Sequence, residues 1–156
     1  MSMLSTISVV FYPGVNGALG VIAGHTAKNY SVPQSYIDGD ITHDYGLFSI
    51  NSNIGKDRGY FGWSTSASVG TTVQIAGYPC EHPNELWLAG KQIKKVTTNQ
   101  LYYDVDATGG QSGSPVYTNP NQVVTAIHTY GTSSSVSYNS GTRINVGLSN
   151  LMSTYR

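Results

Sequence analysis

The 156-residue sequence contains a single cysteine, Cys80, and few charged residues. One cysteine can form neither an internal disulfide bond nor a cysteine-based zinc cage, so a disulfide-stapled scaffold and a zinc finger are both excluded. Charged residues make up only 10% of the chain, and eight basic residues balance eight acidic ones. A surface that binds nucleic acid or an anionic membrane needs clustered positive charge. The composition therefore argues against both kinds of partner.

Long apolar runs are also missing. No run approaches the roughly 18 residues that a membrane-spanning helix needs. Residues 1–5 lack the basic and apolar regions of a signal peptide, so the sequence predicts no export signal and leaves the compartment open. Glycine (18) and tyrosine (12) are abundant instead. This composition excludes coiled coils and helical bundles and indicates an all-β chain with many turns.

Alternating apolar and polar residues, bounded by glycine, proline and asparagine, predict a series of β-strands. The one helical pattern lies near the C-terminus, where apolar residues from Val146 to Tyr155 share a face behind Asn145, a candidate N-cap. The glycine- and serine-rich stretch 56–69 predicts a division into residues 1–62 and residues 63–156. The predicted strands are 6–12, 18–23, 28–32, 45–50, 72–77, 86–95, 101–105, 114–117 and 123–128.

Segment 108–116 reads Thr-Gly-Gly-Gln-Ser-Gly-Ser-Pro-Val and has the pattern of a nucleophile loop. Consecutive glycines allow a sharp turn in which backbone N–H groups point inward beside a serine hydroxyl. Acyl transfer needs this combination, because the serine Oγ attacks a carbonyl carbon while preorganised donors stabilise the oxyanion. Ser112 is therefore the candidate nucleophile, and the N–H groups of Gly110 and Ser112 are the candidate oxyanion donors. The alternative, a plain Gly/Ser-rich hairpin, is disfavoured by the length of the motif.

With this motif, the sequence resembles the chymotrypsin-fold serine proteases, and among them the glutamyl endopeptidase (V8-like) group. Segments 44–47 (Asp-Tyr-Gly-Leu), 75–79 (Ile-Ala-Gly-Tyr-Pro) and 126–131 (Ala-Ile-His-Thr-Tyr-Gly) match in the expected order. The resemblance implies an all-β, two-barrel fold with a shortened first barrel and a C-terminal helix. It also implies a serine endopeptidase that acts on peptide or protein substrates without a cofactor or metal, and it suggests secretion.

Asp44 begins an apolar strand pattern, and the resemblance implies that it is the carboxylate of a catalytic triad. Such a carboxylate lies beside the histidine ring, fixes its tautomer and stabilises the imidazolium. The alternative interpretation is an aspartate that caps a turn before a strand.

The histidine of the triad has two competing placements. His25, within Ile-Ala-Gly-His-Thr at 22–26, resembles the family's Thr-Ala-Gly-His-Cys element and precedes Asp44, as the triad order requires. A second alignment matches 11–16 and 30–37 to family segments that follow the catalytic histidine, and it matches more positions. On that alignment the true histidine is not in this chain, whereas His25 is the candidate base if the chain acts alone. His43 is a poorer candidate, because neighbouring strand residues point to opposite faces.

His128 ends the predicted strand 123–128. In glutamyl endopeptidases, the matching histidine and a Thr or Ser five residues before the nucleophile hold the carboxylate of the substrate's P1 residue. Position 107 is alanine here. The resemblance therefore implies His128 and Ala107 as substrate-binding positions, with half of the carboxylate-binding pair missing. A hydrogen-bonded histidine of the scaffold is the alternative for His128.

Two other functions remain open from the sequence. An inactive, truncated protease fold would bind a peptide or a partner chain, and a Gly/Tyr-rich β-domain would stack exposed tyrosines on sugars. If the second alignment holds, the first barrel has too few strands to close and leaves an unpaired edge. We then expect either a homo-oligomer, with strand 6–12 at the contact, or a separate N-terminal fragment that completes the sheet.

Overall fold

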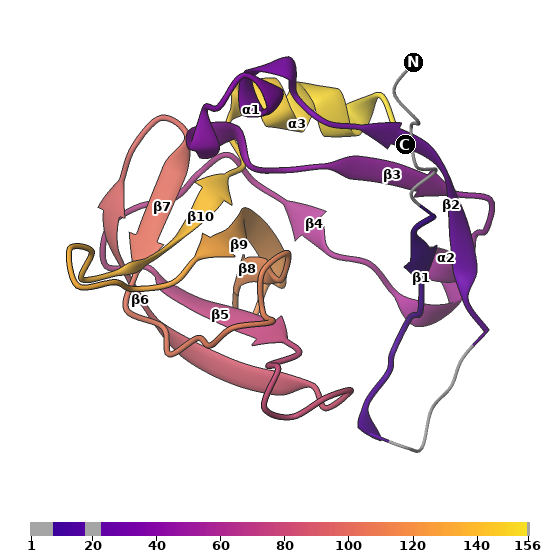
Figure 1. Cartoon of the computed structure of the whole chain (residues 1–156), viewed down its shortest axis with the longest axis horizontal. Helices are drawn as coiled ribbons and strands as arrows, with labels where there is room; N and C mark the ends of the chain where they lie inside the picture. Colours follow the sequence, from indigo (N-terminus) through magenta and orange to yellow (C-terminus); the bar gives the residue numbers. More distant parts are fainter. Residues whose placement is uncertain (1–7, 18–22, 156) are drawn as a thin grey trace, which may run out of the picture.

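The computed structural model describes residues 8–17 and 23–155. It contains a small three-stranded sheet from the N-terminal part and a seven-stranded sheet from the remainder (Figure 1). The mostly β architecture, with a closed barrel, a shortened first barrel and a C-terminal helix, confirms the predicted fold class. The predicted strand 18–23 lies almost wholly outside the described residues.

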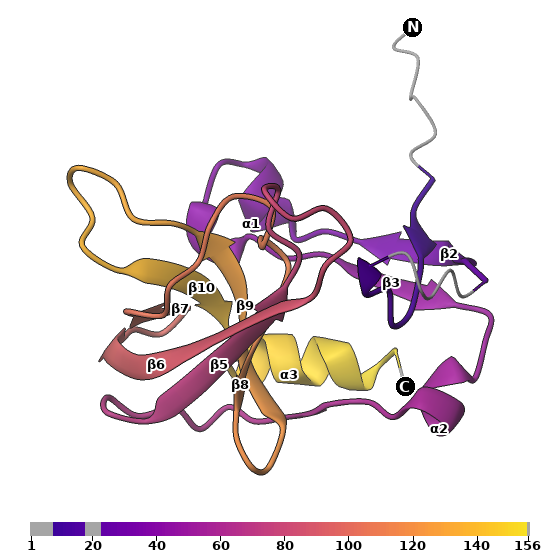
Figure 2. The same ribbon diagram turned by 90° about the horizontal axis from the view of Figure 1, so that it is seen from below.

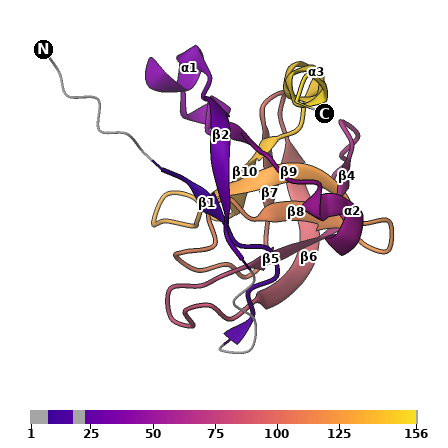
Figure 3. The same cartoon turned by 90° about the vertical axis from the view of Figure 1, so that its right-hand side faces the viewer.

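The small sheet is antiparallel and has the order β1-β2-β3. β1 spans Val10–Phe11, β2 spans His25–Ser31 and β3 spans Leu47–Ile50. Between β2 and β3 lie the short helix α1 (Gln34–Ile37) and the 3-10 helix η2 (Ile41–His43). Both helices are about one turn long, so their apolar residues cannot repeat with the helical period that would have predicted them from the sequence. Figure 3 shows this sheet with β1 and β2 towards the viewer.

The large sheet closes into a six-stranded barrel, because its last strand pairs with β7 on one side and with β9 on the other. Alternate residues of each strand point inward, so Val73, Ile75, Ile93 and Leu101 are fully buried in one core. The predicted strands in this region are confirmed, with ends shifted by two residues at most. The barrel strands are β5 (Thr72–Gly77), β6 (Trp87–Val96), β7 (Gln100–Tyr103), β8 (Pro115–Thr118), β9 (Val123–Tyr130) and β10 (Asn139–Arg143).

Strand β10 has no counterpart among the predicted strands. Its residues, Asn-Ser-Gly-Thr-Arg, lack apolar alternation, yet all but Arg143 are buried. Pairing on both sides explains this burial. A Cβ at Gly141 would lie 2.5 Å from the carbonyl oxygen of Ile127, so the closure of the barrel requires glycine there.

The connection between the two sheets contains α2 (Ile54–Arg58) and β4 (Gly62–Trp63). β4 adds to β9 in parallel, with Gly62 opposite Val123. The predicted division between residues 62 and 63 therefore falls within a strand that already pairs with the large sheet, and the division stays a proposal.

The predicted C-terminal helix is confirmed as α3 (Val146–Ser153). The Asn145 side chain caps it by accepting a hydrogen bond of 2.9 Å from the N–H of Leu148, whose side chain is buried. In Figure 2, α3 runs beneath β3 and next to the barrel. Among the described residues, no helix combines the length and the apolar character needed to span a bilayer.

Candidate active site

Ser112 lies on the loop between β7 and β8, which is tied to the adjacent strand β9. The N–H of Gly113 donates to the carbonyl of His128 at 2.8 Å, and the N–H of His128 donates to the carbonyl of Ser114 at 2.9 Å. The Ser112 side chain is exposed, and its Oγ donates to the carbonyl of Thr129 at 3.2 Å. The hydroxyl is thus held against β9 while remaining open to an incoming group.

The loop also presents two backbone donors. Gly110 has φ of 96°, which favours glycine, and a Cβ there would lie 2.7 Å from both the backbone nitrogen and the Sγ of Cys80. Within the described part of the chain, the N–H groups of Gly110 and Ser112 donate to no protein acceptor. Two available N–H groups beside a serine Oγ are the arrangement that an oxyanion hole needs.

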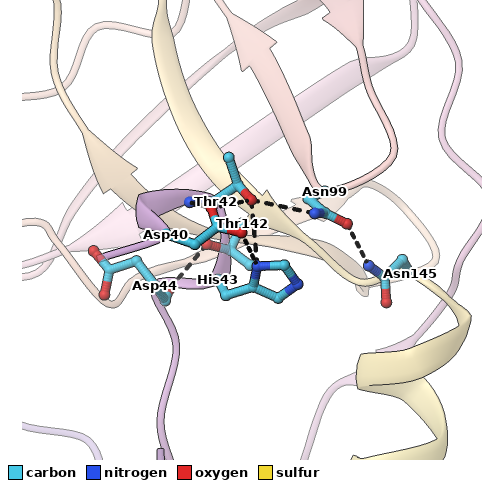
Figure 4. Close-up of polar contacts among 7 residues, drawn as sticks. All are labelled: Asp40, Thr42, His43, Asp44, Asn99, Thr142 and Asn145. Atoms are coloured by element: carbon cyan, nitrogen blue, oxygen red, sulfur yellow. Dashed lines mark hydrogen bonds and ion pairs between the residues drawn. The ribbon is translucent and has the colours of Figure 1, made fainter. Parts of the chain in front are cut away.

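Asp44, which follows η2, shares a pocket of about 330 Å³ with Ser112. The structure thus brings together these two predicted site residues. Burial, and after it a hydrogen bond with Asp44, raises the pKa of the Tyr130 phenol. Thr142 Oγ1 donates to the backbone carbonyl of Asp44 at 2.9 Å (Figure 4). The pocket is lined by Asp44, Tyr45, Gly46, Phe48, Ser112, Gly113, Ile127, His128 and Thr129.

His25 does not line this pocket. It begins β2 and pairs with Phe11 of β1, whereas Ser31, at the other end of β2, pairs with Leu47 just after Asp44. Ser31 lies six positions after His25 along the strand, about 20 Å at a rise of about 3.3 Å per residue. The structure therefore does not bring His25 to Asp44 and Ser112.

His43 faces a second, larger pocket. Its Nδ1 pairs with Asp40 Oδ2 at 2.8 Å, as Figure 4 shows, and its ring lines a pocket of about 790 Å³ between η2, β10 and the start of α3. Asp44 is not among the residues that line this larger pocket. His43 lies in η2 and not in a strand, so the strand alternation used to set it apart from Asp44 does not apply here.

His128 is buried on β9, with only 3% of its surface exposed. Its Nδ1 lies 2.8 Å from the Tyr103 hydroxyl. Burial raises the pKa of Tyr103, so the phenol keeps its proton, and the tautomer of His128 sets which of the two groups donates in this hydrogen bond. Burial also lowers the pKa of His128, and a hydrogen bond with the Ser140 backbone opposes this shift only in part. His128 is therefore held as a neutral ring.

Ala107 lines a separate pocket of about 240 Å³, so it does not share a pocket with His128. That pocket also contains Lys91. Tyr103, Tyr130 and Thr142, which contact His128 or Asp44, were not predicted as site residues from the sequence. No local sequence motif marks these three residues. Each reaches the site only because of the way the strands pair in the folded chain, which the sequence does not show.

The chain was compared with known proteins. It is 37% identical over 142 residues to a glutamyl endopeptidase of Bacillus licheniformis, a match that covers 85% of this chain and 45% of that protein. It is 37% identical over 150 residues to a protein of Bacillus subtilis named extracellular metalloprotease, covering 90% of this chain and 46% of that one. No protein-family model matches.

Among solved structures, a Glu endopeptidase in complex with MPD superimposes with a TM-score of 0.84 and 26% identity. The match covers 94% of this chain and 71% of that one. The chain spans less than half the length of the curated relatives named above.

Within residues 8–17 and 23–155, no three His, Cys, Asp or Glu side chains are grouped to hold a metal ion.

Proposed function

The chain is a chymotrypsin-fold relative of the glutamyl endopeptidases with a shortened first barrel, and we propose that it is a serine endopeptidase domain. Ser112 is the nucleophile and Asp44 is the carboxylate that orients the base. The observation that carries this proposal is one pocket that is lined both by Asp44, from the connection before β3, and by Ser112, from a loop of the barrel.

In the proposed reaction, Ser112 Oγ attacks the carbonyl carbon of the scissile peptide bond. A general base takes the hydroxyl proton, and the N–H groups of Gly110 and Ser112 stabilise the oxyanion of the tetrahedral intermediate. Collapse expels the amine, which receives the proton, and leaves an acyl-enzyme at Ser112. Water then hydrolyses the acyl-enzyme by the same route in reverse.

The finer part of the proposal is a preference for acidic P1 residues. The names of two relatives, glutamyl endopeptidase and Glu endopeptidase, support it. His128 lies at the Ser112 pocket, and Lys91 is the one basic residue among those that line the pocket of Ala107, which also include Asp104 and Asp106. His128→Ala and Lys91→Ala should each lower turnover of Glu and Asp substrates more than turnover of neutral ones. Equal losses on both substrate types would place these residues in the scaffold.

We further propose that another polypeptide completes the small sheet, either a second copy of the chain or an N-terminal fragment. The three strands that the described residues form cannot close a barrel, and their sheet leaves Val10, Tyr30 and Phe48 exposed. Proteins commonly cover such edges and apolar faces.

A fluorophosphonate probe tests the central proposal, because it reacts covalently with an activated serine. Labelling that maps to Ser112 and disappears in Ser112→Ala supports the endopeptidase. An intact fold without labelling, whether alone or with a completing polypeptide, would instead favour an inactive protease fold that binds peptides. The exposed Ser112 hydroxyl and the two available N–H groups favour the first outcome.

A further inference from the structure

The larger pocket, between η2, β10 and the start of α3, is lined by neither Ser112 nor Asp44. Its volume of about 790 Å³ falls within the range of about 300–1,000 Å³ that is usual for pockets that bind small molecules. No Asp or Glu is among the described residues that line it, and Arg143 is the only lysine or arginine among them. The walls therefore carry a positive charge without a negative one, which suits an anion.

Arg143, the last residue of β10, carries this charge. Its Nη1 donates to the carbonyl of Thr97 and its Nη2 to the carbonyl of Thr65, both at 2.9 Å. These bonds fix the guanidinium in place, but carbonyl oxygens do not neutralise it. Among the described residues, no carboxylate forms an ion pair with Arg143, and its Nε is buried without a hydrogen-bond partner. A partly buried guanidinium without a counterion indicates that a negatively charged ligand belongs beside it.

The walls of the larger pocket are held together by hydrogen bonds. Asn99 joins two of them, because its Nδ2 donates to Thr42 Oγ1 at 3.2 Å and its Oδ1 accepts from Asn145 Nδ2 at 3.0 Å (Figure 4). Asn145 in turn caps α3. The pocket thus has its shape before a ligand arrives, and preorganisation of this kind lowers the entropic cost of binding.

The remaining walls indicate the chemical class of the anion. Val96 and Val146 offer aliphatic carbons, and Thr98 offers a hydroxyl. An inorganic anion would leave these carbons and most of the volume in contact with water, whereas an organic anion would cover them. We infer that the larger pocket binds a small organic acid, with its carboxylate at Arg143 and its carbon skeleton against the two valines.

This ligand site is separate from the Ser112 pocket, although Tyr45 lines both. Its occupancy is measured as binding and not as turnover. The inference therefore does not depend on whether Ser112 is a nucleophile.

Benzoate is the probe of the larger pocket, and benzamide is its neutral counterpart of nearly the same shape. In NMR titrations at pH 7, benzoate should shift the backbone amide signals of Thr98 and Gly147 saturably, with half-saturation at or below about 1 mM. The signal of Gly90, in the first half of β6 and outside the pocket, should stay in place. Benzamide should bind about tenfold more weakly or not at all, because it carries no charge for Arg143.

Two results of these titrations would overturn the inference. Benzamide that binds as tightly as benzoate would show that the pocket does not recognise the charge. Sulfate that binds as tightly as benzoate would show a site for inorganic anions, without a role for the aliphatic wall.

Two substitutions test the charge of the pocket. Arg143→Gln removes the guanidinium and should weaken benzoate binding about tenfold or more. Because this change also breaks the bonds to Thr65 and Thr97, Val146→Glu is a second test that keeps Arg143 intact. Val146 is 65% exposed and begins α3, a position at which a glutamate is compatible with the helix. Its carboxylate should repel benzoate and compete for Arg143, so binding should again weaken about tenfold.

Val146→Gln is the matched control, because glutamine has the size of glutamate without its charge. It should change the affinity for benzoate by less than about twofold, since Arg143 and its bonds are retained. Benzoate that binds Val146→Glu and Val146→Gln equally well would overturn the assignment of this pocket to a carboxylate.

Discussion

The hydroxyl of Thr142 donates a hydrogen bond of 2.9 Å to the backbone carbonyl of Asp44, 98 positions earlier in the chain. This bond joins β10 of the barrel to the segment that carries the proposed triad carboxylate. Asp44 is not in regular structure, since it lies between η2 and β3. The position of the carboxylate relative to Ser112 therefore depends on a contact with the last strand of the barrel.

Replacing Thr142 tests this dependence. Thr142→Val removes the hydroxyl at nearly constant shape and leaves the carbonyl of Asp44 without its donor. Since Thr142 is only 2% exposed, we expect unfolding in urea to show a loss of about 1–2 kcal/mol. We also expect a lower rate at which the fluorophosphonate probe labels Ser112. Thr142→Ser retains the hydroxyl and should preserve the labelling rate; a loss equal to that of Thr142→Val would indicate a packing effect instead.

Ser112→Ala should separate activity from stability. The side chain is exposed, and its one hydrogen bond, to the Thr129 carbonyl, is long at 3.2 Å. We expect covalent labelling and any peptidase activity to be lost while the free energy of unfolding changes by less than about 0.5 kcal/mol. Residual peptidase activity in the purified variant would rule out Ser112 as nucleophile.

Two adjacent glycines of the serine loop should respond differently to alanine. At Gly110, φ of 96° disfavours a side chain, and the new Cβ would lie within 2.8 Å of the Tyr78 carbonyl and Cys80. Gly110→Ala should therefore cost about 1–3 kcal/mol of stability and move the N–H group that we assign to the oxyanion hole. The labelling rate of the folded protein should fall.

Gly109→Ala is the matched control, because a Cβ at that position meets no atom within 4 Å. Its thermal unfolding and its labelling rate should remain close to those of the parent chain. If both variants lose labelling equally, general rigidity of the loop, and not the N–H of Gly110, governs reactivity.

Most strands of the barrel could be predicted from the sequence because their inward residues are apolar. β5 is the clearest case, since Val73 and Ile75 alternate with more exposed positions and the predicted bounds match those found. β10 could not be predicted in this way. It is buried through its two neighbours and a glycine, and its own residues are polar.

The candidate site divides along similar lines. A local motif identifies Ser112 and its loop, because the chemistry requires neighbouring glycines in the sequence. Asp44 and Ser112 line the same pocket because of the way the two sheets pack. The sequence suggested this proximity only through the family resemblance. The position of His25 depends on the register of β2 against β3, which a single sequence does not reveal.

The pH dependence of stability should show that His128 is buried and neutral in the folded chain. Burial lowers its pKa in the folded state below the ordinary value near 6.5. The unfolded chain therefore takes up a proton first as the pH falls, so His128 lowers stability below about pH 6.5 and not above it. Each pH unit within the interval between the two pKa values should cost up to about 1.4 kcal/mol.

Urea unfolding at pH 7.5 and at pH 5.5 measures this effect against two variants. His128→Gln should be less stable than the parent at pH 7.5, because the ring's bond to Tyr103 is lost, but its stability should fall less on acidification. His82→Gln is the comparison variant, because that imidazole is not buried: it stacks on Trp87 with 42% of its side chain exposed. The comparison between variants removes the contribution of the carboxylates, which titrate in all three proteins. Equal pH dependence in the parent and in His128→Gln would mean that His128 gains and loses its proton alike in the folded and unfolded chains.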